Sequence, residues 1–149
     1  MIWSRSDYWL EQAEVEARDL ASQVYRMVVR QSFNQPGFAI IAFPASLSSR
    51  SLREVMLRLK QELSRLFCEQ WHEPLEYLSL GRFDQQTTTK LHLDGAPDRS
   101  ILMLGYEPTE VVSEFIIADY SACAHPHGIN SRGFPVTAQP DVHSGTRTP

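Results

Sequence analysis

The stretch KLHLDGAPDRS, residues 90–100, places a histidine and an aspartate two positions apart. Alternate residues of a strand project from the same face, so His92 and Asp94 can present an imidazole nitrogen and a carboxylate oxygen to one ion. With a second histidine they would form the two-histidine, one-carboxylate triad, which leaves coordination positions of Fe(II) open. The tripeptide alone is a weak signal, because a half-exposed strand alternates polar and apolar residues without any metal.

Upstream of this pair, the sequence predicts a helix, a strand and a second helix. Residues 7–30 repeat apolar side chains at steps of three and four, the pattern of an amphipathic helix. Residues 37–43 form a short apolar run that ends at a proline, which is typical of a buried strand. Ser51 and Glu54 have capping-box spacing ahead of an apolar stripe, which predicts a helix from about residue 51 to residue 71.

From residue 75 the apolar period changes from 3.6 to 2. We expect strands over residues 75–83, 87–94, 100–107 and 113–121, so that His92 and Asp94 end the second of them. Helices followed by a run of strands indicate an α+β fold with a mainly antiparallel sheet.

The composition changes at residue 124. Residues 124–149 contain four prolines and three glycines among 26 residues, with few large apolar side chains. Such a segment buries too little apolar surface to offset its ordering entropy. We therefore expect one domain over residues 1–123 and an irregular or disordered tail over residues 124–149.

The H-x-D pair and the order of elements resemble the Fe(II)/2-oxoglutarate-dependent dioxygenases, in particular the phytanoyl-CoA dioxygenase-like members. The resemblance covers about residues 37–121, with Gly95-Ala96-Pro97 as the turn after the motif. It implies N-terminal helices packed on a partial double-stranded β-helix, a jelly-roll or cupin-like sheet. It also implies that His92 and Asp94 hold Fe(II), and that 2-oxoglutarate is the co-substrate.

The resemblance leaves open which residue is the third metal ligand. The family's distal histidine lies on a late strand, and His143 has the better spacing, 49 residues after Asp94, although little chain is left there for a strand. His125 and His127 follow Asp94 more closely, and the surrounding HPHGIN predicts a turn. The basic residue that the family places about ten positions beyond its histidine has no match, and Arg82 is the candidate for the co-substrate carboxylate.

Three functions remain open on this reading. The resemblance implies hydroxylation of a small organic substrate. A C-terminally truncated relative would instead be an inactive remnant or interaction module of the same fold, and its exposed sheet edges would favour self-association. A metal-dependent hydrolase using His92 and Asp94 is the weakest, because no motif positions a general base.

The overall composition excludes several other classes. The formal net charge of −4 argues against nucleic acid as a partner. The first dozen residues have no apolar signal region, and no run is long enough to cross a bilayer, so we expect a cytoplasmic protein without a membrane partner. Cys68 and Cys123 form no CxxC pattern and are expected to be small core residues.

Overall fold

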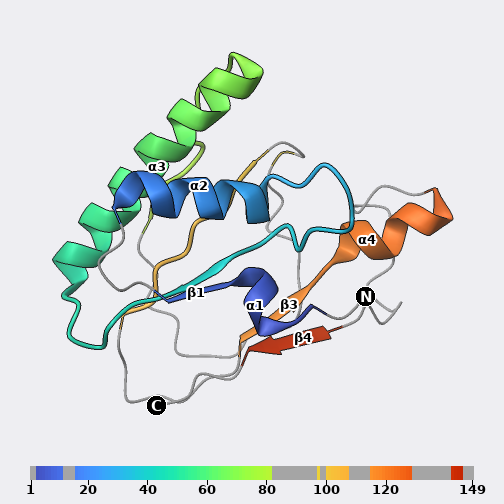
Figure 1. Ribbon diagram of the computed structural model, residues 1–149, viewed down its shortest axis with the longest axis horizontal. Helices are drawn as coiled ribbons and strands as arrows, with labels where there is room; N and C mark the ends of the chain where they lie inside the picture. Colours follow the sequence, from blue (N-terminus) through green and yellow to red (C-terminus); the bar gives the residue numbers. More distant parts are fainter. Residues whose placement is uncertain are drawn as a thin grey trace. The chain divides into compact units, whose positions relative to one another are not determined.

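The computed structural model of the chain describes residues 3–11, 16–81, 97, 100–107, 115–128 and 142–145 (Figure 1). The chain divides into two compact units. The first unit comprises Trp3–Gly81 and Met103–Pro108, and the second comprises the rest of the chain. Each unit is described by itself.

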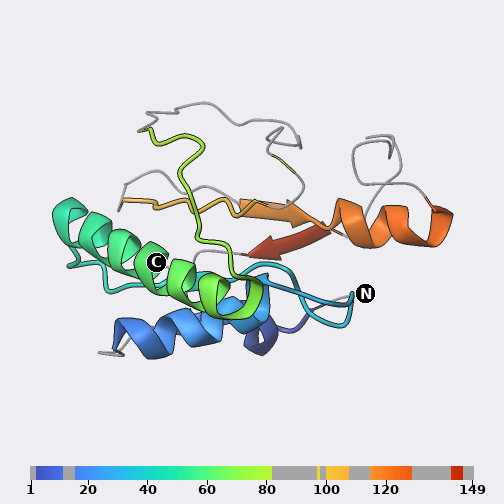
Figure 2. The ribbon, with the colours of Figure 1, turned by 90° about the horizontal axis from the view of Figure 1, so that it is seen from above.

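The first unit contains three helices and a pair of strands among its described residues. In chain order they are α1 (Arg5–Tyr8), β1 (Trp9–Glu11), α2 (Ala17–Val28), β2 (Ile40–Ala42) and α3 (Ser49–Trp71). The two strands pair in parallel, with Leu10 opposite Ile41. Figures 1 and 2 show α2 packed along α3, the longest helix of the unit.

The predicted helix over residues 7–30 is only partly correct. Its second half is α2, but residues Trp9–Glu11 form β1 instead. The backbone of Leu10 pairs with that of Ile41, 31 positions further along the chain, and the Leu10 side chain packs against the core from the strand. A long-range pairing has therefore overridden the local helical period.

The core of the first unit lies between α2 and α3. Its buried members come from the apolar stripes that the sequence predicts for the two helices: Leu20, Ala21, Val24, Leu59 and Leu63. Leu63 is 1% exposed. Leu10 and Ile41 pack against this cluster, so the strand pair closes the side that the helices leave open. The strand predicted over residues 37–43 is confirmed over Ile40–Ala42, but these residues are half-buried and not fully buried.

Helix α3 has the predicted extent, but a different N-cap. The Oγ of Ser48 accepts a hydrogen bond from the amide of Ser51 at 3.1 Å, so Ser48 is the cap and Ser51 lies in the first turn. Glu54 forms an ion pair with Arg50 at 3.2 Å. The Glu54 carboxylate therefore pairs with a side chain one helical turn away on the exposed face of α3.

Hydrogen bonds near the end of α3 tie it to α2. The hydroxyl of Tyr25 donates to Oε1 of Gln70 at 2.6 Å and accepts from Nε1 of Trp71 at 3.0 Å. The ring of Tyr25 also meets Phe67 edge-on, with centroids 5.2 Å apart. Tyr25 therefore joins the two helices by polar and aromatic contacts beside the apolar core.

A charged cluster lies on the outer part of α3. Arg65 donates to Glu62 at 3.0 Å and also pairs with Glu69. These two hydrogen bonds raise the pKa of the Arg65 guanidinium above its usual value. The group stays charged at any physiological pH.

The strands predicted over residues 75–83 and 100–107 are wrong where the structure describes them. Residues 75–81 and 100–107 contain no hydrogen-bonded strand. The amide of Leu75 donates to the Oγ of Ser64 on α3 at 2.9 Å, and Met103 packs on the core. Apolar alternation alone does not make a strand, because a strand also needs a neighbouring backbone.

The second unit contains β3 (Phe115–Ala118), α4 (Tyr120–Ala124), the 3-10 turn η1 (His125–His127) and β4 (Val142–Gly145). Strands β3 and β4 are antiparallel. The strand predicted over residues 113–121 is confirmed at β3, whereas Tyr120 and Ser121 begin α4, capped by the Asp119 carboxylate at the amide of Ala122.

The described residues thus contain both helices and strands, and their strands form two separate pairs. The jelly-roll sheet and the division at residue 123 stay predictions. Cys68 is exposed on α3, so the expectation that it is a core residue is wrong, and Cys123 is half-buried. None of the helices described in this chain combines the length and the apolar composition that crossing a bilayer requires.

Candidate functional site

The predicted iron site falls mainly on residues outside the described part of the chain. His92, Asp94 and Arg82 all lie between residues 82 and 96, which the structure does not describe. Their roles as metal ligands and as the co-substrate contact therefore stay predictions. Of the four candidate residues, only His143 has a described backbone.

His143 lies in a strand. It is the second residue of β4, and in the antiparallel register it faces Ile117 of β3. A strand is unexpected so near the end of a proline-rich segment. The pairing with β3, 26 positions earlier, supplies the backbone partner that the local sequence cannot reveal.

His125 and His127 occupy a different setting. Both lie in η1, directly after α4, and both are exposed. Gly128 follows with a φ of 64°, which ends the turn. The expectation of a turn in HPHGIN, and not of a ligand-bearing strand, is confirmed for these residues.

Side chains that bind metals do not cluster within the described ranges. There, no group of three or more His, Cys, Asp or Glu side chains is arranged to hold a metal ion.

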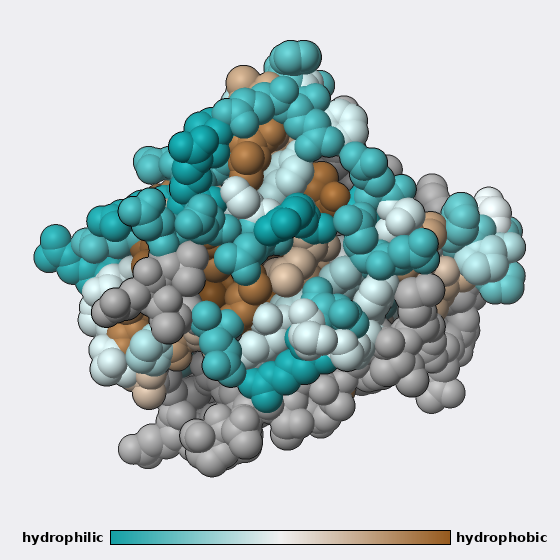
Figure 3. All heavy atoms as spheres, viewed as in Figure 1, coloured by the Kyte–Doolittle hydropathy of each residue, from teal (hydrophilic) through white to brown (hydrophobic). Residues whose placement is uncertain are grey.

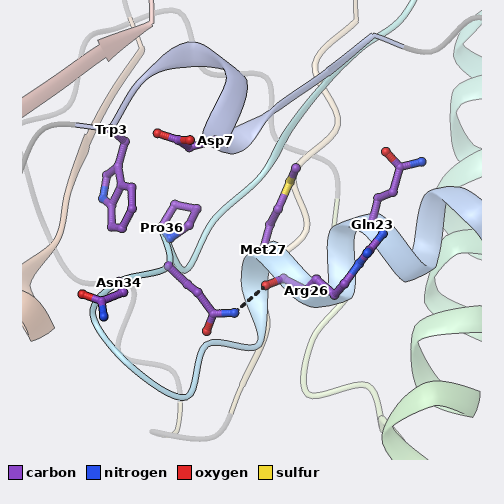
Figure 4. Close-up of a pocket in the computed structure, with 8 residues that line it drawn as sticks. Trp3, Asp7, Gln23, Arg26, Met27, Asn34 and Pro36 are labelled. Carbon is purple, nitrogen blue, oxygen red and sulfur yellow. Dashed lines mark hydrogen bonds between the residues drawn. The ribbon is translucent and has the colours of Figure 1, made fainter.

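An open depression of about 390 Å³ lies on the first unit (Figure 4). It lies where the start of the chain, α2 and the turn after α2 meet, and the sequence analysis did not anticipate it. The lining residues are Trp3, Asp7, Gln23, Arg26, Met27, Asn34, Gln35 and Pro36. The NQPG motif at residues 34–37 is the sequence feature that could have indicated this depression, because the turn there returns the chain onto α2.

Several polar groups of this depression are already hydrogen-bonded to neighbouring residues. The Asp7 carboxylate accepts from the amide and from the hydroxyl of Ser4, each at 2.8 Å. The Nε of Arg26 donates to the carbonyl of Ser22 at 3.2 Å, and the Arg26 carbonyl accepts from the Gln35 side chain at 3.3 Å, the dashed line in Figure 4. Asp7 is the single carboxylate among the lining residues, which include no histidine or cysteine. The depression therefore lacks a paired acid and base.

Comparison with known proteins adds no assignment. No family model, no curated protein and no solved structure matches this chain.

Proposed function

We propose that the chain is a dioxygenase-type protein that uses Fe(II) and 2-oxoglutarate, with His92, Asp94 and His143 as its metal ligands. The proposal starts from the H-x-D spacing, which directs an imidazole and a carboxylate to one side of an extended chain. Neutral imidazole with carboxylate suits a divalent first-row metal, whereas an all-oxygen site would suit magnesium or calcium.

The position of His143 is the observation that carries the proposal. A facial triad needs a third ligand from a strand distant in sequence, and His143 is the candidate that lies in a paired strand, β4. His125 and His127 lie in an exposed turn, which makes them weaker candidates. Strand pairing fixes the backbone of a residue, and a fixed backbone is what a metal ligand requires.

Fe(II) would supply the oxygen chemistry at this site. In the overall reaction, one oxygen atom of O₂ enters the substrate as a hydroxyl group, and the other enters succinate as 2-oxoglutarate loses CO₂. The chain would hold the metal through His92, Asp94 and His143 and leave coordination positions open for the co-substrate. Arg82 would bind the far carboxylate of 2-oxoglutarate by paired hydrogen bonds.

Metal binding is the first test. The full-length chain is titrated with Fe(II) under anaerobic conditions, and His92→Ala, Asp94→Ala and His143→Ala are each expected to weaken binding by about tenfold or more. His125→Ala is the matched control, because it removes an exposed imidazole of the same unit and should leave binding unchanged. If His92→Ala and Asp94→Ala bind Fe(II) like the parent chain, the metal assignment is wrong.

Turnover of 2-oxoglutarate is the second test. Succinate formation by the Fe(II)-loaded chain, lost in Arg82→Met, supports a dioxygenase. Fe(II) bound through His92 and Asp94 without succinate formation identifies the alternative, an inactive remnant or interaction module. If His143→Ala alone binds Fe(II) like the parent chain, His92 and Asp94 remain metal ligands and the third ligand is a residue other than His143.

A further inference from the structure

The depression beside α2 has an apolar wall. Hydrophobic and hydrophilic residues lie side by side on the face drawn in Figure 3, and the lining of this depression contains both kinds. Its apolar members are Trp3, Met27 and Pro36. In Figure 4, Trp3 and Pro36 lie on one side and Met27, on α2, lies on the other. The volume of about 390 Å³ is within the range of about 300–1,000 Å³ that is usual for small-molecule sites.

Hydrogen bonds hold the walls of the depression in place. The amide of Gly37, at the end of the NQPG turn, donates to the carbonyl of Met27 on α2 at 3.0 Å. The Asp7 carboxylate, on α1, is fixed by the amide and the hydroxyl of Ser4. Walls that are already ordered lower the entropic cost of binding a ligand.

Both charged side chains of the lining keep hydrogen-bonding capacity for a ligand. Oδ2 of Asp7 accepts both hydrogen bonds from Ser4, so Oδ1 is left. Nε of Arg26 donates to the carbonyl of Ser22, which leaves Nη1 and Nη2. Across the described ranges, neither Asp7 nor Arg26 forms an ion pair. One carboxylate and one guanidinium therefore line the same space without neutralising each other.

Two amide side chains add to this polar set. Gln23 and Asn34 line the depression, and their side chains form no hydrogen bond within the part of the chain that the structure describes. Each amide offers two donor hydrogens and a carbonyl acceptor. The depression thus combines an apolar wall with several polar groups available to a ligand, the usual composition of a small-molecule site.

We propose that this depression binds a zwitterionic α-amino acid with an aromatic side chain. Oδ1 of Asp7 accepts from the ammonium group of the ligand, and the Nη atoms of Arg26 donate to its carboxylate. The aromatic ring of the ligand lies against Trp3 and Pro36, where stacking favours a flat ring over a branched aliphatic side chain. The thioether of Met27 also makes favourable contacts with aromatic rings.

The charges of the lining select this class of ligand. Arg26 is the single cation among the described lining residues, and Asp7 repels a second negative charge. A nucleotide with several phosphates is therefore disfavoured. A ligand with one charge would satisfy only one of the two side chains, whereas a zwitterion satisfies both. This inference does not rest on the proposed iron chemistry, because none of the proposed metal ligands lines the depression, and either can fail without the other.

An NMR titration of the full chain with L-phenylalanine tests the proposal. The depression is open, so we expect a dissociation constant on the order of 1 mM. In nitrogen–proton correlation spectra, the indole N–H signal of Trp3, identified as the one absent from Trp3→Phe, should shift and saturate. The indole signals of Trp9 and Trp71, which do not line the depression, are the internal control and should stay in place.

Two analogues of phenylalanine test the zwitterion. Phenethylamine lacks the carboxylate, and phenylpropionate lacks the ammonium group. Each should bind about fivefold more weakly than L-phenylalanine, because an exposed ion pair contributes at most a factor of about five. Equal binding of phenethylamine overturns the role of Arg26, and equal binding of phenylpropionate overturns that of Asp7.

Charge-removing variants test the same two side chains from the protein. Asp7→Asn and Arg26→Gln should each raise the dissociation constant for L-phenylalanine about fivefold. Asp19→Asn and Arg18→Gln are the matched controls: both residues are exposed on α2 outside the lining, and these variants should bind like the parent. Well-dispersed spectra confirm that each variant is folded. Absence of a saturable Trp3 shift at about ten times the expected dissociation constant overturns the proposal, as do equal effects of the lining variants and their controls.

Discussion

The packing of α2 on α3 predicts a large stability loss when Leu63 is shortened to alanine. Leu63 is the largest fully buried side chain of the described residues, and it is 1% exposed. Its neighbours in the core come from both helices, so no single flexible side chain can fill the space it would leave. The change removes the burial of three carbon atoms and creates a cavity.

The expected magnitude follows from that burial. Leucine-to-alanine changes at such sites lower the free energy of unfolding by about 3 kcal/mol. That is roughly a hundredfold change in the unfolding equilibrium, and a large part of the total stability of a domain of this size. Leu57→Ala is the matched control, because Leu57 lies on the same helix and is 49% exposed. It should cost less than about 1 kcal/mol.

Urea unfolding of the two variants, followed by far-ultraviolet circular dichroism, measures this difference. Both changes alter helix propensity equally, so the difference isolates burial. A gap of less than about 1 kcal/mol between the two variants would refute the packing of α2 on α3 as described here.

Two further predictions concern the backbone of the first unit. Ser48→Ala should lower the free energy of unfolding by about 1 kcal/mol because α3 loses its N-cap, whereas Ser46→Ala, at an exposed position before the helix, should have little effect in the same urea assay. Gly37→Ala should cost about 1 to 2 kcal/mol, because φ is 76° and the new Cβ would lie 3.0 Å from the Arg30 side chain. Gly128→Ala has a similar φ of 64° with open space around it, so in thermal unfolding it should lower Tm less; equal losses would contradict the crowding at Arg30.

The sequence predicted the elements whose signal is local. The apolar stripe from Leu52 to Phe67 defines α3 almost to its ends, because helical hydrogen bonds join residues four positions apart. The short branched runs likewise marked the positions of β2 and β3. Even here the sequence could not choose the N-cap among several serines, since Ser48 and Ser51 both precede the stripe.

For the candidate metal site, too, only the short-range pattern of residues could be recognised in the sequence. The spacing of His92 and Asp94 suggests a metal because two positions along a strand is a short-range relation. His143 carries no local strand signal. Its pairing with Ile117 shows that a residue from the C-terminal segment can be held in a fixed backbone.

Only the tertiary structure shows which segments, distant in sequence, pair their backbones. Residues Trp9–Glu11 carry a helical pattern, yet they form a strand because Ile40–Ala42 lies beside them. Residues 101–107 carry a strand pattern, yet in the described part of the chain they have no strand partner. In both cases the alternation or periodicity of apolar residues fixes which face is buried. The partner that satisfies the backbone is set by chain segments tens of residues away, and no local pattern encodes it.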